Sequence, residues 1–228
     1  MNFVKLAIVD CISIYTTVHS MHTATLVHAT NDGEKLIAYM ARVSNPKNQD
    51  NPSYDKLIKY LIDHKHWSPF EMVNICVEIN TTRSVAAQIL RHRSFSFQEF
   101  SQRYSVVTDL PVIPQLREQD SKNRQNSTDT LPQQLTDELK SKIDDLYAHS
   151  QDVYSLLITN GVAKECARDV LPLSSPTKLY MNGTLRSWLH YCDLRCGNGT
   201  QLEHKLIADQ VKSLIKLCYP AVYRAMWS

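Results

Sequence analysis

Glycine is scarce in this chain. Only five of the 228 residues are glycine, and they form neither a Gly-x-Gly-x-x-Gly pattern nor a Gly-x-x-x-x-Gly-Lys-Ser/Thr pattern. Both motifs bind phosphates through backbone N–H groups at the start of a helix. Their absence excludes a Rossmann or P-loop phosphate site at the level of motifs. Any nucleotide must therefore be held by side chains, and the planar fork of arginine suits phosphate oxygens best.

The cysteines offer no structural zinc site. All six have irregular spacings, and no Cys-x-x-Cys pair occurs, so the paired ligands of such a site are missing. Most of them lie in apolar periodic segments, where a free thiol packs as a small hydrophobic group. Free thiols are typical of a reducing compartment. We therefore expect a cytoplasmic protein without a metal site.

Long apolar runs are also missing. No stretch of the chain reaches the roughly 18 apolar residues of a membrane span. Asp10 interrupts the apolar first segment, and no small-residue cleavage site follows it, so no secretory signal is expected. Met21 comes just before the first convincing strand. Residues 1–20 are therefore predicted to be an extension, and residues 21–228 a single domain.

The composition and the apolar periodicity predict a globular fold with few strands and many helices. Hydrophobic residues make up 43% of the chain and charged residues 21%, with a net charge of +2, which is ordinary for a soluble domain. We expect an α/β or α+β fold, with a small mixed β-sheet flanked by several helices. The expected strands are 24–30, 72–79 and 178–181, and the expected helices are 31–43, 53–64, 82–91, 139–160, 163–171, 185–196 and 202–218. Residues 115–138 are polar and without period, which predicts a mobile surface loop.

The most distinctive segment, residues 91–104, is basic and aromatic. It begins with Arg91-His92-Arg93 and includes Arg103, with Glu99 as its one acidic residue. Cations this close repel one another unless they face an anion. The alternative is that they only complement the dipole at the end of a helix. The aromatic residues, which distinguish the segment from a solvated basic tail, are Phe95, Phe97, Phe100 and Tyr104.

Ser101 lies in the same segment. A nucleophilic serine needs a base that a third group positions. The sequence supplies no Gly-x-Ser-x-Gly elbow and no local oxyanion hole. A hydrogen bond to a phosphate or carbonyl oxygen, or a place facing the solvent, fits Ser101 better.

Two other arginines stand out. Arg195 follows Trp188 and Cys192 at helical spacing, so it ends an apolar stripe and either extends to water or pairs with a bound anion. Arg168 either pairs with its neighbour Asp169 on a solvated face or holds an anion in the same way.

Residues 64–71 contain two histidines and a glutamate, too few ligands for a metal site. They form either a loop that presents His66 and Trp67 to a planar ligand or an ordinary end of a helix before a proline turn.

Four separated segments resemble the flavin-dependent thymidylate synthases. They are residues 41–44, 64–71, 88–104, and a fourth that continues from 168–172 to 186–203. The specific element is Arg-His-Arg, seven residues, then serine, and the four segments follow the order found in the family. The resemblance implies the protomer of a homotetramer in which several subunits build each site.

The resemblance also implies roles for individual residues. FAD would be bound by Ser44, Ser68, Arg91, His92, Arg93, Glu99, Thr184, Leu185, Arg186 and His190. The uridylate, dUMP, would be bound by Gln88, Arg91, Glu99, Ser101, Gln102, Arg103, Arg168 and Arg195. Arg195 would help to ionise the uracil at N3, and His66 would lie near the flavin, where folate and NADPH approach. Gly199 stands where some members have a histidine.

The reaction implied is the reductive methylation of dUMP to dTMP. 5,10-Methylenetetrahydrofolate would supply the carbon, and FAD reduced by NADPH would supply a hydride. A preorganised arginine near the pyrimidine would stabilise the anion that develops there. This chemistry belongs to de novo dTMP biosynthesis and needs no cysteine nucleophile.

Two other classes of function compete with this one. A nucleic-acid-binding module would use the aromatic residues of segment 91–104 to stack bases, but the charge is near neutral and no RNP, KH or zinc-finger pattern occurs. A structural oligomer would bind neither FAD nor dUMP. We expect no nucleic-acid and no membrane partner.

Overall fold

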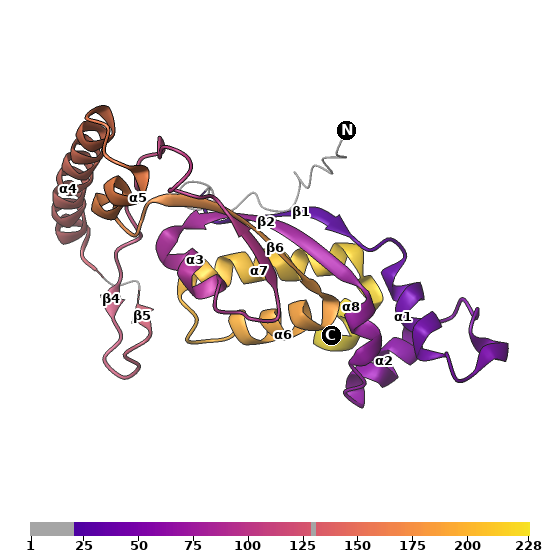
Figure 1. Ribbon diagram of the computed structural model, residues 1–228. Coiled ribbons are helices and arrows are strands. Elements are labelled where there is room, and N and C mark those ends of the chain that lie inside the picture. Colours follow the sequence, from indigo (N-terminus) through magenta and orange to yellow (C-terminus); the bar gives the residue numbers. More distant parts are fainter. Residues whose placement is uncertain (1–20, 129–130) are drawn as a thin grey trace.

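The computed structural model describes residues 21–128 and 131–228 (Figure 1). The predicted extension, residues 1–20, lies outside the described residues. In chain order the elements are β1 (Thr23–Ala29), α1 (Gly33–Ala41), η1 (Pro46–Asn48), α2 (Asp55–Asp63), η2 (Ser68–Met72), β2 (Asn74–Thr82), α3 (Arg83–Ile89), β3 (Ser96–Glu99), β4 (Glu118–Gln119), β5 (Ser127–Thr128), α4 (Gln133–Thr159), α5 (Lys164–Ala167), η3 (Arg168–Val170), β6 (Pro176–Thr184), α6 (Leu185–Arg195), α7 (Leu202–Cys218) and α8 (Pro220–Trp227).

A four-stranded sheet in the order β1-β2-β6-β3 forms the centre of the fold. Its two inner strands pair over their whole length, from Asn74 opposite Thr184 to Thr82 opposite Pro176. The α+β class is confirmed, but every pair of neighbouring strands is antiparallel, not mixed as expected. The alternating pattern could not decide this, because the side-chain period is two residues in either arrangement.

One face of the sheet carries the main core. Ile75, Val77 and Ile79 of β2 are at most 1% exposed, and α6 and α7 lie beneath them (Figure 1). Burial of side chains of this size contributes about 1.5–3 kcal/mol each. The indole N–H of Trp188 on α6 donates to the Ile75 carbonyl at 3.0 Å, which fixes this helix against the strand.

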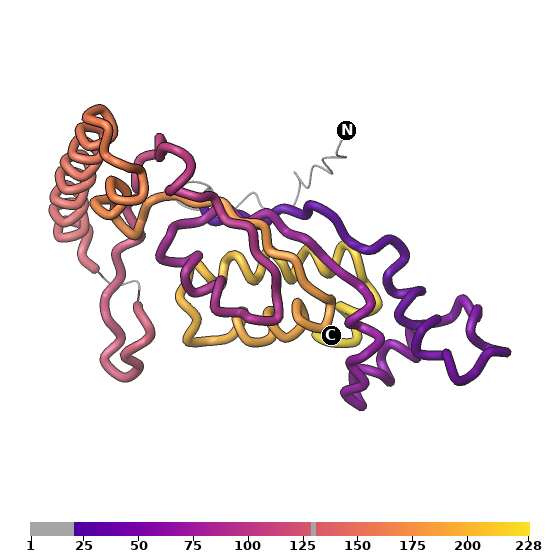
Figure 2. Tube along the Cα trace, viewed as in Figure 1, coloured from indigo at the N-terminus to yellow at the C-terminus, as the bar shows by residue number. Residues whose placement is uncertain are grey.

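Helices α1 and α2 lie at one end of the molecule and α4 and α5 at the other (Figure 2). At the second end, Tyr154 of α4 packs with Val107 and Ala167 in a smaller core. The Tyr154 hydroxyl also accepts a hydrogen bond from the Val107 N–H at 3.0 Å. These contacts hold the chain after the basic segment next to α5 and η3.

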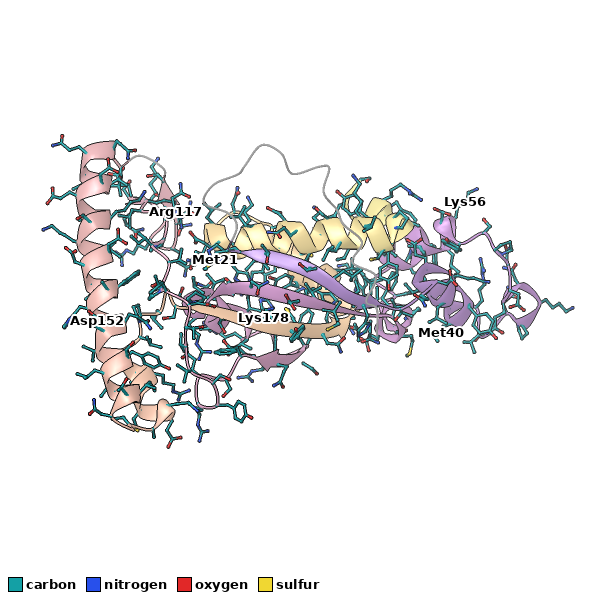
Figure 3. All side chains as sticks on the ribbon, turned by 90° about the horizontal axis from the view of Figure 1, so that it is seen from above. Met21, Met40, Lys56, Arg117, Asp152 and Lys178 are labelled. Atoms are coloured by element: carbon teal, nitrogen blue, oxygen red, sulfur yellow. The ribbon has the colours of Figure 1, made fainter. Side chains whose placement is uncertain are left out.

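The described part of residues 115–138 is not structureless, in contrast to the mobile loop expected there. β4 and β5 form a short hairpin, and α4 begins at Gln133. Arg117, which lies between α4 and the body of the protein (Figure 3), donates to both carboxylate oxygens of Glu203, at 2.7 and 3.1 Å. A bidentate pair at the start of α7 therefore anchors the hairpin.

Strand β3 and helix α8 were also not predicted. β3 lies inside the basic segment, where only Phe97 gives it an apolar residue to alternate with polar ones. α8 begins at Pro220, which occupies the first helical turn, where a missing N–H costs nothing. Within the described ranges, no helix is both long and apolar enough to cross a membrane.

Candidate active site

The basic segment begins where α3 ends. Helix α3 buries Val85, Ala86 and Ile89, and the N–H groups of Arg91 and His92 donate to the Gln88 and Ile89 carbonyls in the turn that follows it. The chain then turns into β3.

Phe95 anchors this turn against β6. A side chain at Gly183 would place its Cβ 2.4 Å from the Phe95 ring, so this close approach requires glycine. Arg91 and Arg93 are exposed as a result, whereas His92 is half-buried.

His92 and Arg195 meet although 103 residues separate them. The Nε–H of Arg195 donates to Nε2 of His92 at 2.9 Å, so this nitrogen is unprotonated. Burial, Arg195 and His190 together lower the pKa of His92 from 6.5 to about 4. The imidazole is therefore neutral, and its other nitrogen, Nδ1, carries the proton.

Arg195 is more exposed than the buried residues that precede it on the same face of α6. Trp188 and Cys192 are both fully buried, while the guanidinium is half-buried beside His92. Only its Nε–H bonds His92, which leaves the donors on its two terminal nitrogens for a ligand.

Two residues that sequence reasoning missed, Tyr191 and His204, lie behind this pair. Both are fully buried. The Tyr191 ring lies edge-on to His92, with ring centroids 5.0 Å apart, and its hydroxyl is 3.1 Å from Nε2 of His204. Nδ1 of His204 is 3.3 Å from the side-chain oxygen of Gln88. The only signal in the sequence was a histidine on the face of α7 that carries Ile207 and Ala208.

Glu99 is paired inside the protein. Its carboxylate accepts hydrogen bonds from Arg83 at 2.7 Å and from the Thr177 hydroxyl at 3.0 Å. This arginine lies at the start of α3, outside the basic segment, and the sequence gave no reason to select it.

A hollow of about 360 Å³ lies at the α4–α5 end, lined by Ser101, Arg103, Tyr104, Ala163, Lys164 and Glu165. Arg103 donates to the Glu165 carboxylate at 2.9 and 3.1 Å, and both side chains are more than half exposed. The Ser101 side chain is exposed as well. The hollow thus combines a hydroxyl with cationic groups, which is the chemistry of a site for a phosphate or carboxylate.

Two further candidates lie close to this hollow in sequence. Gln102 is 6% exposed, and its Nε2 has no hydrogen-bond partner among the described residues. Arg168 is half-buried, with its Nε 3.9 Å from the Asp169 carboxylate. That distance is too long for a hydrogen bond, so the donors of Arg168 are not committed to Asp169.

The start of α6 holds four of the proposed flavin contacts. Thr184 caps the helix by accepting from the Ser187 N–H at 3.3 Å. The side chain of Leu185 is buried in the core and is not available to a ligand. Arg186 is exposed and paired with Glu71, and His190 is exposed one turn later.

His66, Ser44 and Ser68 belong to the α1–α2 end and are exposed. The His66 ring lies edge-on to Tyr60, with ring centroids 5.9 Å apart. Figure 3 shows Met40 on α1 and Asp152 on α4 at opposite ends of the molecule. Within one chain, Ser44 and His66 are therefore not brought together with Arg103 and Arg168.

The aromatic residues of segment 91–104 do not form a surface for stacking bases. Phe95 is 9% exposed and packs edge-on against Trp188 at 4.6 Å. Phe97 is packed against the same core. Phe100 and Tyr104 are exposed, but they are only half of the set on which the nucleic-acid hypothesis depended.

Comparisons with known proteins agree over nearly the whole chain. The chain is 49% identical over 205 residues to a probable flavin-dependent thymidylate synthase of Paramecium bursaria Chlorella virus 1, covering 90% of this chain and 95% of the relative. It is 48% identical over 193 residues to a flavin-dependent thymidylate synthase of Synechocystis, covering 85% and 89%.

Among solved structures, the UMP/dUMP methylase PolB from Streptomyces cacaoi bound with 5-Br dUMP has a TM-score of 0.80 at 25% identity, covering 90% of this chain and 93% of that chain. The family described as thymidylate synthase complementing protein matches residues 25–221. The chain therefore belongs to the thymidylate synthase complementing protein family, whose curated relatives are flavin-dependent thymidylate synthases.

Proposed function

We propose that this protein is a flavin-dependent thymidylate synthase that converts dUMP to dTMP. The observation that carries the proposal is the contact between Arg195 and His92. It joins the Arg-His-Arg segment to the arginine expected to face the uracil. This contact occurs in a chain that matches flavin-dependent thymidylate synthases over most of its length.

FAD is the cofactor that this proposal requires, and the residues at the sheet edge fit it. Arg91 and Arg93 are exposed cations, and the diphosphate of FAD needs such donors because the glycine motifs are missing. The buried Oδ1 of Asn182, opposite Ser96 in the sheet, has no hydrogen-bond partner among the described residues. When bound, FAD reduced by NADPH supplies the hydride.

The uridylate is proposed to extend along the basic segment. Ser101, Arg103 and Arg168 bind the phosphate, and the unpartnered amide of Gln102 lies in the same turn. Gln88 lies next to His204, which packs edge-on against His92. Gln88 therefore contacts the pyrimidine.

Arg195 has the role of activating the uracil. Its Nε–H is used by His92, and the neutral state of His92 keeps a second positive charge out of the site. The terminal donors of Arg195 therefore present one cation to the pyrimidine edge. This cation stabilises the negative charge that develops when N3 loses its proton and C5 becomes nucleophilic.

We also propose that the active unit is a homotetramer with sites shared between subunits. Ser44 and His66 follow α1 and α2, whereas Arg168 follows α5 and Arg103 pairs with Glu165 of α5. These helices lie at opposite ends of the molecule (Figure 1), so a neighbouring copy must bring the groups together. Helix α4 carries the exposed apolar residues Leu135, Leu146 and Leu156, which contact with another subunit would cover.

NADPH and 5,10-methylenetetrahydrofolate are the proposed co-substrates, and we propose that the exposed His66 lies near the place where they approach the flavin. A reducing, cytoplasmic location fits the cysteines at positions 76, 166, 192, 196 and 218, which are all free thiols.

The visible absorption spectrum tests the proposal. The purified protein should bind FAD, and its flavin bands should shift when dUMP is added, because both ligands share one site. Deoxyuridine, which lacks the phosphate, serves as the matched ligand and should cause the same shift only at much higher concentration. A protein that binds no FAD, or whose flavin bands do not respond to dUMP, would contradict the proposal.

A further inference from the structure

A fully buried histidine, His204, lies behind the candidate site. It is 0% exposed on the inner face of α7, and burial together with Arg195 and His92 lowers the pKa of its imidazole to about 3. The ring is therefore neutral at ordinary pH, with one nitrogen that donates and one that accepts. The reaction proposed above assigns it no task.

A chain of hydrogen bonds decides which nitrogen donates, and it starts at Glu203. Burial raises the pKa of this carboxyl, but hydrogen bonds from Arg117 and Gln201 outweigh burial and leave the pKa below its usual value. Glu203 is thus a carboxylate that can only accept. Gln201 donates to it through Nε2 at 2.8 Å, so the side-chain oxygen of Gln201 points the other way.

That oxygen faces Gln88. It accepts from Nε2 of Gln88 at 2.5 Å, which turns the side-chain oxygen of Gln88 toward His204. Nδ1 of His204 lies 3.3 Å from this oxygen and must therefore carry the ring proton.

Tyr191 completes the chain. Nε2 of His204 is left as an acceptor and accepts a hydrogen bond from the Tyr191 hydroxyl at 3.1 Å. Burial raises the pKa of the Tyr191 hydroxyl, so this donor keeps its proton. Every hydrogen bond from Tyr191 to Glu203 thus has a fixed direction, and a reversed Gln88 amide would set two acceptors against each other.

We propose that His204 and Tyr191 are positioning residues for uridylate binding, which fix the side-chain amide of Gln88 in one orientation. Gln88 then offers the ligand one remaining N–H and one remaining lone pair in fixed places. Tyr191 also lies edge-on against His92, the partner of Arg195. The inference rests on the proposed function, because it takes Gln88 to contact dUMP.

Three variants test this role. For each, the flavin absorption spectrum is used to measure two dissociation constants, one for FAD and one for dUMP. His204→Leu removes both ring nitrogens and should weaken dUMP binding about tenfold, and Tyr191→Phe should weaken it about threefold, because each breaks one or two buried hydrogen bonds. His204→Asn places an amide N–H near the position of ring Nδ1 and should restore dUMP binding to within about threefold of the parent. FAD affinity should stay within about twofold of the parent in all three, because none of these side chains is proposed to contact FAD.

Tyr219→Phe is the matched control. Tyr219 is also buried, and its hydroxyl donates to the Thr30 carbonyl at 2.9 Å in another part of the core. This variant loses a buried tyrosine hydroxyl just as Tyr191→Phe does, so a general loss of stability would affect both. Only Tyr191→Phe should change the affinity for dUMP.

Two outcomes overturn the inference alone. One is equal weakening of dUMP binding in His204→Leu and His204→Asn. The other is unchanged dUMP binding in Tyr191→Phe, which removes a single oxygen and decides the matter should His204→Leu fail to fold. A parent protein that binds FAD but not dUMP would instead overturn the proposed function, and this inference with it.

Discussion

The buried histidine makes the stability of the protein sensitive to acid. In the folded protein His204 has a pKa of about 3, against an ordinary value of 6.5. Below pH 6.5 this histidine is therefore protonated in the unfolded chain but stays neutral in the folded protein. The unfolded state then binds more protons, so the free energy of unfolding falls as the pH falls. His92, with a pKa of about 4, acts in the same direction.

The size of this loss of stability depends on how far apart the folded and unfolded pKa values of His204 lie. Between the folded and unfolded pKa values of a histidine, each pH unit lowers the free energy of unfolding by up to about 1.4 kcal/mol. The titration of His204 alone should therefore lower it by about 2–3 kcal/mol between pH 6.5 and 4.5. With a slope of about 1–3 kcal/mol per molar urea, this loss lowers the midpoint of unfolding by roughly 1 M.

Urea unfolding at a series of pH values provides the assay. The fluorescence of the three tryptophans reports unfolding, and ligands are left out and protein concentration held constant because both change apparent stability. His204→Leu removes the titrating group, so its stability should fall less steeply than that of the parent between pH 6.5 and 4.5. Tyr219→Phe should give a curve parallel to that of the parent. Equal slopes for His204→Leu and the parent would refute the reasoning.

Three further predictions concern the site. Arg195→Ala should lower dTMP formation at least about a hundredfold while FAD stays bound; activity within tenfold of the parent would remove Arg195 from the role of activator. Ser101→Ala should keep measurable activity, because the proposal gives Ser101 a hydrogen bond to the phosphate and no nucleophilic role, and complete loss of turnover with intact dUMP affinity would restore Ser101 as a nucleophile. Arg103→Ala should weaken dUMP binding about tenfold, because a charge-assisted hydrogen bond to the phosphate is lost; an equal loss for deoxyuridine in a titration would show that the phosphate is not its partner.

The fold could be predicted where the apolar period was long. The strand β2 alternates half-buried and buried residues from Asn74 to Thr81, and the helices α6 and α7 began and ended within one residue of expectation. β3 has four residues, and its place depends on pairing with β6, a contact that no local pattern records. The β4–β5 hairpin depends likewise on the anchoring of Arg117 to Glu203, 86 residues away.

The site could be predicted only as a set of residue types. Arg91-His92-Arg93 stood out because three adjacent basic residues are unusual, and Arg195 stood out because it ends an apolar stripe, with its role supplied by the resemblance. Neither indicated that Arg195 would bond His92. The Tyr191–His204 pair could not be predicted, because a buried histidine with a role at the site and a buried histidine without one have the same local sequence pattern. Its meaning comes from bonds to Gln88, 116 residues away.

Conversion of dUMP to dTMP tests the central claim most directly. The protein is incubated with FAD, NADPH, 5,10-methylenetetrahydrofolate and dUMP, and the nucleotides are separated and measured. We expect dTMP to form in the complete mixture, and to be lost when FAD or NADPH is omitted or when Arg195→Ala replaces the parent. A folded protein that binds FAD and dUMP but forms no dTMP in the complete mixture would contradict the assignment.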